Sequence, residues 1–180
     1  MGCSIGSKIA LMLACDHPEV FRAAILVGGN SGPQNQFDGR IRDYRAHARA
    51  GTLADYHLGH LRHGVTPGWA DGQEGQRLLA GFVARGKDLD AHSIARVFEA
   101  LTVSDLTPKL AALRMPMLVV NGEHDMSFDA GVETAKLVPG AVHAVIKDAG
   151  HACQIENPWD FDAAVLPFLK THGLWAGDSV

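Results

Sequence analysis

The sequence predicts an α/β fold in which parallel strands alternate with flanking helices, and in which an all-helical insertion interrupts that alternation. Short apolar runs, each followed by glycine, are typical of strands covered on both faces of a parallel sheet. Segments with helical spacing of apolar residues lie between and after these runs. A strand–helix–strand order implies right-handed crossovers, so we expect one layered core.

The core elements are expected in a fixed order along the chain. Residues 4–15 are small and apolar and end at Asp16-His17-Pro18, which predicts a buried helix with a proline stop. The apolar runs predict strands at 23–27, 115–120 and 142–146. Helical spacing of Phe161, Val165 and Phe168 predicts a last helix over 157–171, and another helix is expected over 128–137.

The middle of the chain, residues 30–107, is predicted to be an all-helical insertion. Its helices are expected near 38–50, 53–62, 74–85 and 91–101. The expected breaks are Gly51, the segment 64–72 with Pro67, and Gly86-Lys87-Asp88. The sequence therefore divides into a core of residues 1–29 and 108–180 and an insertion of residues 30–107.

Length and composition exclude several classes of protein. The 180 residues suffice for one domain with a sizeable core plus an insertion. Hydrophobic residues make up 47% and charged residues 20%, near the globular average, so neither disorder nor a fibrous repeat is expected. A formal charge of −4 with scattered basic residues argues against nucleic-acid binding. No apolar stretch approaches a membrane span of about 20 residues.

The cysteines and histidines do not predict a metal site. Cys3, Cys15 and Cys153 follow no metal or disulfide spacing, and an odd number argues against a secreted disulfide scaffold. We therefore expect a cytoplasmic protein. Histidines recur every third residue in the insertion, but no carboxylate or cysteine is spaced to complete a metal site with them. These histidines are His57, His60 and His63.

Arginines cluster on the first helix of the insertion. They could attract an anionic substrate, but neighbouring aspartates at positions 38 and 43 favour a solvated charged face. The arginines are Arg40, Arg42, Arg45 and Arg49.

The N-terminus carries the pattern G-x-S-x-G as Gly2-Cys3-Ser4-Ile5-Gly6. In such a turn the glycines permit a sharp, strained backbone that exposes the central hydroxyl. A helix that starts at Ser4 would direct its amide donors at developing negative charge. By itself the pattern also fits a glycine-rich helix cap. Cys3 is out of phase with the glycines, and we expect it to be a buried structural thiol.

Polar residues follow the next two strands. Asn121-Gly122-Glu123-His124-Asp125 comes after the second predicted strand, and Gly150-His151 comes after the third. Functional groups in α/β sheets gather at the carboxyl ends of strands, so Asp125 can orient the imidazole of His151. The order Ser, Asp, His differs from the trypsin-like and subtilisin-like orders. Glu123 and Asp129 are alternative acids.

Taken together, these motifs resemble the α/β-hydrolase superfamily over nearly the whole chain. The matching segments are 2–6, 16–20, 105–113 leading into 115–118, 122–125, and Gly150-His151 with Glu156 and Pro158. The resemblance implies that Ser4 is the nucleophile, Asp125 the acid and His151 the base, with the amide of Ile5 as an oxyanion donor. It also implies that the insertion is a cap that shapes the substrate pocket.

The resemblance further implies a chemistry. Dehalogenases and epoxide hydrolases of this superfamily carry aspartate where this chain has Ser4, so a serine implies an ester-like or other acyl substrate of small size. The reaction needs no cofactor. Carbon–carbon bond hydrolysis of activated ketones is the alternative, because the same three residue types serve both reactions.

The front of the chain departs from the superfamily, because only Met1 precedes the serine turn. The resemblance implies that the first five strands are missing, together with the loop that supplies a second oxyanion donor, whose loss costs about 10²–10³ in turnover. A late start codon, a gene fragment or a shortened clone would each explain this. The competing expectation is a catalytically inactive fragment. The strand at 23–27 would then be an exposed sheet edge prone to self-association.

Overall fold

The computed structural model describes residues 1–34, 38–85 and 88–175. Two compact units form, one from Met1–Ser31 with Leu106–Val180 and the other from Gly32–Asp105. The break expected at Gly86-Lys87-Asp88 lies mostly outside the described residues. Within them, no helix is both long and apolar enough to cross a membrane.

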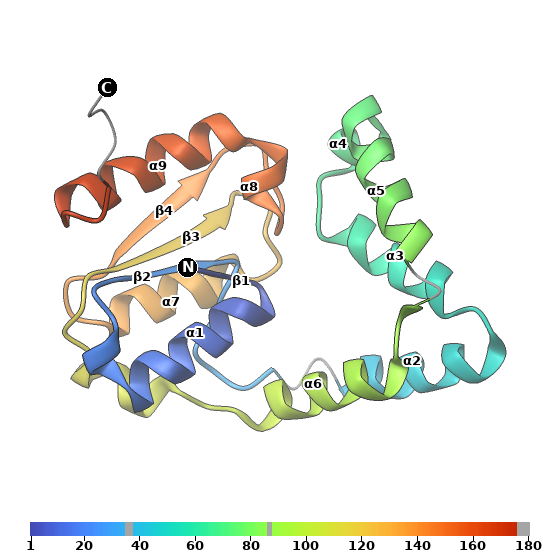
Figure 1. The fold of residues 1–180 in the computed structure, drawn as a ribbon, viewed down its shortest axis with the longest axis horizontal. Coiled ribbons are helices and arrows are strands. Elements are labelled where there is room, and N and C mark those ends of the chain that lie inside the picture. The colour runs from blue at the N-terminus through green and yellow to red at the C-terminus, as the bar shows by residue number, and fades with distance from the viewer. Residues whose placement is uncertain (35–37, 86–87, 176–180) are drawn as a thin grey trace. The chain divides into compact units, whose positions relative to one another are not determined.

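The first unit is built on a parallel sheet, which confirms the predicted α/β class (Figure 1). Its strands, in the spatial order β1-β2-β3-β4, are Gly2–Cys3, Ala24–Val27, Met117–Gly122 and Val142–Ile146. Leu26 pairs with Gly2 on one side and with Val119 on the other. Because all strands run in the same direction, their carboxyl ends lie along one edge of the sheet, where polar groups can gather.

Helices cover both faces of this sheet (Figure 1). One face carries α1 (Ile5–Asp16), the 3-10 helix η4 (Thr107–Ala112) and α7 (Phe128–Leu137). The opposite face carries α8 (Cys153–Glu156) and α9 (Pro158–Thr171). A second 3-10 helix, η1 (Pro18–Val20), follows α1. The alternating side chains of β2 therefore enter two separate hydrophobic clusters.

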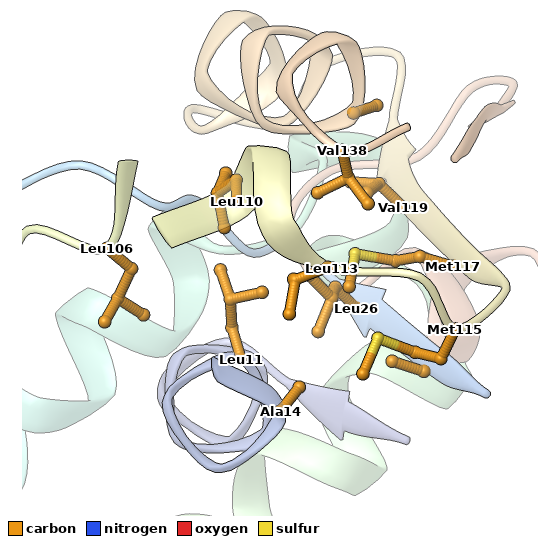
Figure 2. Close-up of a cluster of buried hydrophobic side chains, with 12 residues drawn as sticks. Leu11, Ala14, Leu26, Leu106, Leu110, Leu113, Met115, Met117, Val119 and Val138 are labelled. Atoms are coloured by element: carbon orange, nitrogen blue, oxygen red, sulfur yellow. The ribbon is translucent and has the colours of Figure 1, made fainter. Parts of the chain in front are cut away.

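Figure 2 shows the cluster between the sheet and α1, η4 and α7. Leu11 from α1 and Leu110 from η4 lie against Leu26, Met117 and Val119 of the strands. These five side chains come from α1, β2, η4 and β3, and each is completely buried. Burial of a side chain of this size contributes about 1.5–3 kcal/mol, so this cluster fixes α1 on the sheet.

Two expectations about the first strand and helix were wrong. The strand at 23–27 is not the sheet edge, because β1 lies beyond it and pairs with Leu26 and Val27. Self-association through a sheet edge stays a prediction. Helix α1 is also not buried all round: Ile9, Met12 and Leu13 are 52%, 40% and 47% exposed. A helix on one face of a sheet buries one stripe, and these residues lie outside it.

The second unit is all-helical. Its helices are α2 (Asp38–Ala50), α3 (Leu53–His63), α4 (Pro67–Asp71), α5 (Gln73–Arg85) and α6 (Ala91–Val103). Helix α4 was not expected, because Pro67 was interpreted as part of a break. Proline is favoured in the first turn of a helix, where its missing N–H has no intrahelical acceptor. Pro67 occupies that place in α4, directly after Thr66.

Candidate active site

Ser4 lies in a strained turn between β1 and α1. Its backbone has φ 52° and ψ −117°, in the left-handed half of conformational space that costs a residue with a side chain about 1–3 kcal/mol. Its N–H donates to the Val27 carbonyl oxygen at 2.8 Å, which holds the turn against β2. A Cβ at Gly2 would overlap the Gly6 carbonyl oxygen, so this tight turn requires glycine at position 2. The fold thus maintains a strained backbone at the serine.

The three residues expected to act together are in hydrogen-bond contact. His151 Nε2 lies 2.8 Å from Ser4 Oγ, and His151 Nδ1 lies 2.8 Å from Asp125 Oδ1. Ser4 follows β1, Asp125 follows β3 and His151 follows β4, so the common edge of the parallel sheet brings them together. A carboxylate oxygen only accepts hydrogen bonds, so the imidazole carries its proton on Nδ1 and can accept the serine proton on Nε2.

The Asp125 carboxylate is completely buried. Burial alone would raise the pKa of Asp125, but hydrogen bonds from His151, Ser127 and Asn121 lower it, and the net pKa lies below its usual value. The carboxylate is therefore ionised at neutral pH, although it is shielded from water. An ionised acid in this position can hold the imidazole in one orientation and stabilise its protonated form.

Ile5 is the first residue of α1, directly after the serine. The first N–H groups of a helix have no acceptor inside the helix, so the Ile5 amide is available to an oxyanion next to Ser4. The positive end of the α1 dipole adds to this electrostatic attraction for negative charge.

Gly28 is a site residue that the sequence reasoning missed. It has φ +60°, and a Cβ there would lie 2.7 Å from His151 Cε1 and 3.4 Å from Asp125 Oδ2. Glycine at the end of β2 therefore leaves room for the imidazole ring. In the sequence, Gly28 is simply the glycine that follows the apolar run 23–27. A glycine directly after a predicted strand, where α/β sheets place their functional groups, was the sequence feature that could have indicated this role.

Asn121 and Ser127 were also missed. Asn121 Nδ2 donates to Asp125 Oδ2 at 2.8 Å, and both the N–H and Oγ of Ser127 donate to Asp125 Oδ1 at 2.8 Å. Both residues lie within a few positions of Asp125, so the polar character of the segment 121–127 was the available signal. The structure does not bring the alternative acids Glu123 and Asp129 to His151; both side chains are exposed.

The expectation of a buried thiol at position 3 was wrong. Cys3 is exposed, and its Sγ accepts a hydrogen bond from Gln154 Nε2 at 3.3 Å. Cys3 pairs with Val27 and therefore lies on the α8 face of the sheet, but β1 is the last described strand on its side, so no further strand covers it. Cys153, in contrast, is buried, and that burial raises its pKa to about 12. Neither thiol is among the hydrogen-bond partners of the His151 imidazole in the described part of the chain.

Two of the three histidines of α3 contact the same tyrosine. His57 Nδ1 lies 2.8 Å from the Tyr44 hydroxyl, and the His60 ring stacks on the same tyrosine. Over residues 1–34, 38–85 and 88–175, three metal-type ligands gather only at Glu123, His124 and Asp148, which are exposed.

The arginines of α2 behave mostly as a solvated face. Arg45 pairs with Glu99 of α6, and the Arg42 guanidinium lies 3.6 Å from Asp43 with both side chains largely exposed. Arg40 lies over the Phe98 ring, 5.6 Å from its centroid. The contacts of Arg45 and Arg40 join α2 to α6.

The sequence is similar to a known protein family and to a known protein. A family model described as alpha/beta hydrolase fold matches residues 1–158. The chain is 32% identical over 176 residues to the polyketide synthase ThaQ of Burkholderia thailandensis, covering 94% of this chain and 8% of that protein.

Solved structures extend the comparison. The enol-lactonase from Burkholderia xenovorans LB400 superposes with a TM-score of 0.81 at 23% identity, covering 94% of this chain and 64% of its own. A hydrolase from Pseudomonas aeruginosa PA01 gives a TM-score of 0.79 at 26% identity, covering 93% of this chain and 63% of its own. The chain therefore spans less than two thirds of each structure's length.

Proposed function

Because the chain belongs to the α/β-hydrolase family, we propose that it is a serine hydrolase that cleaves an ester-like or other acyl bond in a small molecule. The observation that carries this proposal is the hydrogen-bonded path from Ser4 Oγ through the imidazole of His151 to the carboxylate of Asp125. The hydrolase relative from Pseudomonas aeruginosa, at 26% identity, supports the same class of reaction.

The proposed reaction begins with proton transfer from Ser4 Oγ to His151 Nε2 as the oxygen attacks the acyl carbon. Asp125 stabilises the imidazolium that forms. The carbonyl electron pair moves to oxygen, and the Ile5 amide donates to that oxyanion. As the intermediate collapses, the imidazolium gives its proton to the leaving group. Water, activated by the same imidazole, then releases the acyl group from Ser4.

The helical unit Gly32–Asp105 is proposed to act as the cap that selects the substrate. Its insertion after β2, between two segments of the catalytic unit, supports this assignment. The substrate class proposed here rests on the serine, since a hydroxyl nucleophile suits acyl transfer.

Reaction with a fluorophosphonate tests the nucleophile, because an activated serine oxygen attacks phosphorus as it attacks an acyl carbon. We expect stoichiometric labelling of the peptide that contains Ser4, no labelling of Ser4→Ala, and sharply reduced labelling of His151→Ala. Ser104→Ala, at the end of α6 in the helical unit, is the matched control and should label normally. Persistent labelling of Ser4→Ala would refute the assignment.

A further inference from the structure

The two oxygens of the Asp125 carboxylate have different partners. Oδ1 accepts from His151 Nδ1 and from both donors of Ser127, all at 2.8 Å. Oδ2 accepts from Asn121 Nδ2, also at 2.8 Å. A carboxylate held through both oxygens cannot rotate about its Cβ–Cγ bond without losing a hydrogen bond. Asn121 therefore controls the oxygen that His151 does not touch.

The orientation of the Asn121 amide is set from its other side. Its Oδ1 lies 3.0 Å from Nε2 of His143, a half-buried residue and the second residue of β4. An ionised carboxylate only accepts, so the amide NH₂ must face Asp125 and the amide oxygen must face His143. That oxygen also only accepts, so His143 carries its proton on Nε2. The direction of each hydrogen bond thus follows from the charge on Asp125.

Packing around Asn121 leaves no room for another arrangement. The side chain is completely buried, and a Cβ at Gly131 of α7 would overlap Asn121 Oδ1. The ring of Phe128, the first residue of α7, meets the His143 ring edge-on at 5.4 Å between centroids. Burial lowers the pKa of His143, which keeps its ring neutral with a single ring proton at pH 7. Helix α7 therefore holds both members of this pair in place.

We propose that Asn121 and His143 are positioning residues that hold the Asp125 carboxylate toward His151, so that a histidine on β4 acts on Ser4 through three intervening side chains. This inference rests on the proposed serine hydrolase chemistry. It assigns a function to a fully buried amide and to a histidine that touches none of the reacting atoms. The serine turn and the Asp125–His151 hydrogen bond can both form without Asn121 and His143.

Replacing Asn121 tests the nearer of the two residues. Asn121→Leu keeps the branched shape of the side chain but removes the donor to Asp125 Oδ2. We expect the rate constant for phosphonylation of Ser4 to fall by about 10²-fold, the loss that a small misplacement of a catalytic group can cause. The reagent concentration for half-maximal rate should stay unchanged. In proton NMR, we expect the His151 Nδ1–H resonance to lie far downfield in the wild type and to shift or broaden in this variant.

Two substitutions of His143 separate positioning from packing, and they serve equally if Asn121→Leu fails to fold. Glutamine can place an amide N–H where the imidazole Nε2–H lies, whereas leucine fills the space without a donor. We expect His143→Gln to keep most of the labelling rate and His143→Leu to lose about tenfold. The reverse ranking, or equal wild-type rates in both, would overturn the proposal.

A control and a second readout distinguish failure of this inference from failure of the proposed function. His124, an exposed histidine beside the same loops, should tolerate both Gln and Leu without change in rate. If the wild-type protein leaves Ser4 unlabelled, the proposed hydrolase chemistry fails. The His151 Nδ1–H resonance still decides the positioning role: an unchanged resonance in Asn121→Leu and His143→Leu would refute it.

Discussion

Two clusters of polar side chains, one around Asp125 in the first unit and one around Tyr44 in the helical unit, are stabilised in different ways. In the first unit, the buried Asp125 carboxylate accepts hydrogen bonds from Asn121, Ser127 and His151. In the helical unit, the Tyr44 ring stacks with the rings of His60 and Phe98, at 5.7 Å and 5.5 Å between centroids. The first cluster is held by directed donors around a charge, and the second mainly by ring packing.

The difference is clearest at a ring nitrogen of the second cluster for which the structure describes no hydrogen bond. His60 Nε2 is buried and has no hydrogen-bond partner among the described residues. Burial, with smaller contributions from the nearby charge of Arg40 and from His57 and His63, lowers the pKa of His60 to about 4. Burying a neutral ring costs less free energy than burying a charge, but protonation of the ring in acid adds that larger cost. The helical unit is therefore expected to be the more sensitive to acid.

The largest effect is expected when the charge of the first cluster is removed. Asp125→Asn keeps the shape of the side chain but cannot hold the Nδ1–H tautomer of His151, and such a change has cost about 10⁴ in turnover elsewhere. The measurement is kcat with p-nitrophenyl acetate, or the phosphonylation rate of Ser4. Asp129→Asn, an exposed aspartate on α7, is the control. If Asp129→Asn caused the greater loss, the acid would be Asp129.

Acid should affect the two clusters at different pH values. The lowered pKa of His60 means that its contribution to stability is complete above about 6.5 and is lost as the pH falls toward about 4. The pKa of Asp125 is lowered from 3.8, so the contribution of its carboxylate to stability persists until the pH falls below about 3.8.

Amide hydrogen exchange at pH 7 and pH 5, corrected for intrinsic rates, measures this difference. Exchange in α2, α3 and α6 should accelerate by about tenfold at pH 5, because a partly exposed ring retains only part of the full effect. Exchange in β2 and β3 should stay constant. His60→Phe should remove most of the acceleration, and the rest is expected from His57, whose pKa burial also lowers. Earlier opening of the sheet would contradict the comparison between the clusters.

The smallest effect is expected from the single hydroxyl of the second cluster. Tyr44→Phe removes the 2.8 Å hydrogen bond to His57 Nδ1 but keeps the ring. We expect the free energy of unfolding of the helical unit to fall by about 0.5–1.5 kcal/mol in chemical denaturation. Tyr44→Ala provides the scale, with about 3–5 kcal/mol for loss of a large buried ring. Equal losses in both variants would show that the hydroxyl, and not ring packing, stabilises this unit.

The spacing of apolar residues along the sequence predicted several helices and strands correctly. The helix at 128–137 and the strand at 142–146 have the expected bounds. Apolar runs identify strands because both faces of a parallel sheet are covered. The pattern failed at α4, where Pro67 starts a helix, and at α1, whose apolar residues were too uniform to show which stripe is exposed.

The sequence by itself determined which side chains could do chemistry, since a serine between glycines and polar residues at strand ends are visible as local patterns. Only the tertiary structure decided which of them meet. Ser4 and His151 are 147 positions apart, and their contact exists because parallel strands end at one edge. The surroundings of Asn121, which holds Asp125, depend on the same geometry: His143 lies on a strand, and Gly131 lies on a helix. Neither position differs, in the sequence, from an ordinary packing residue.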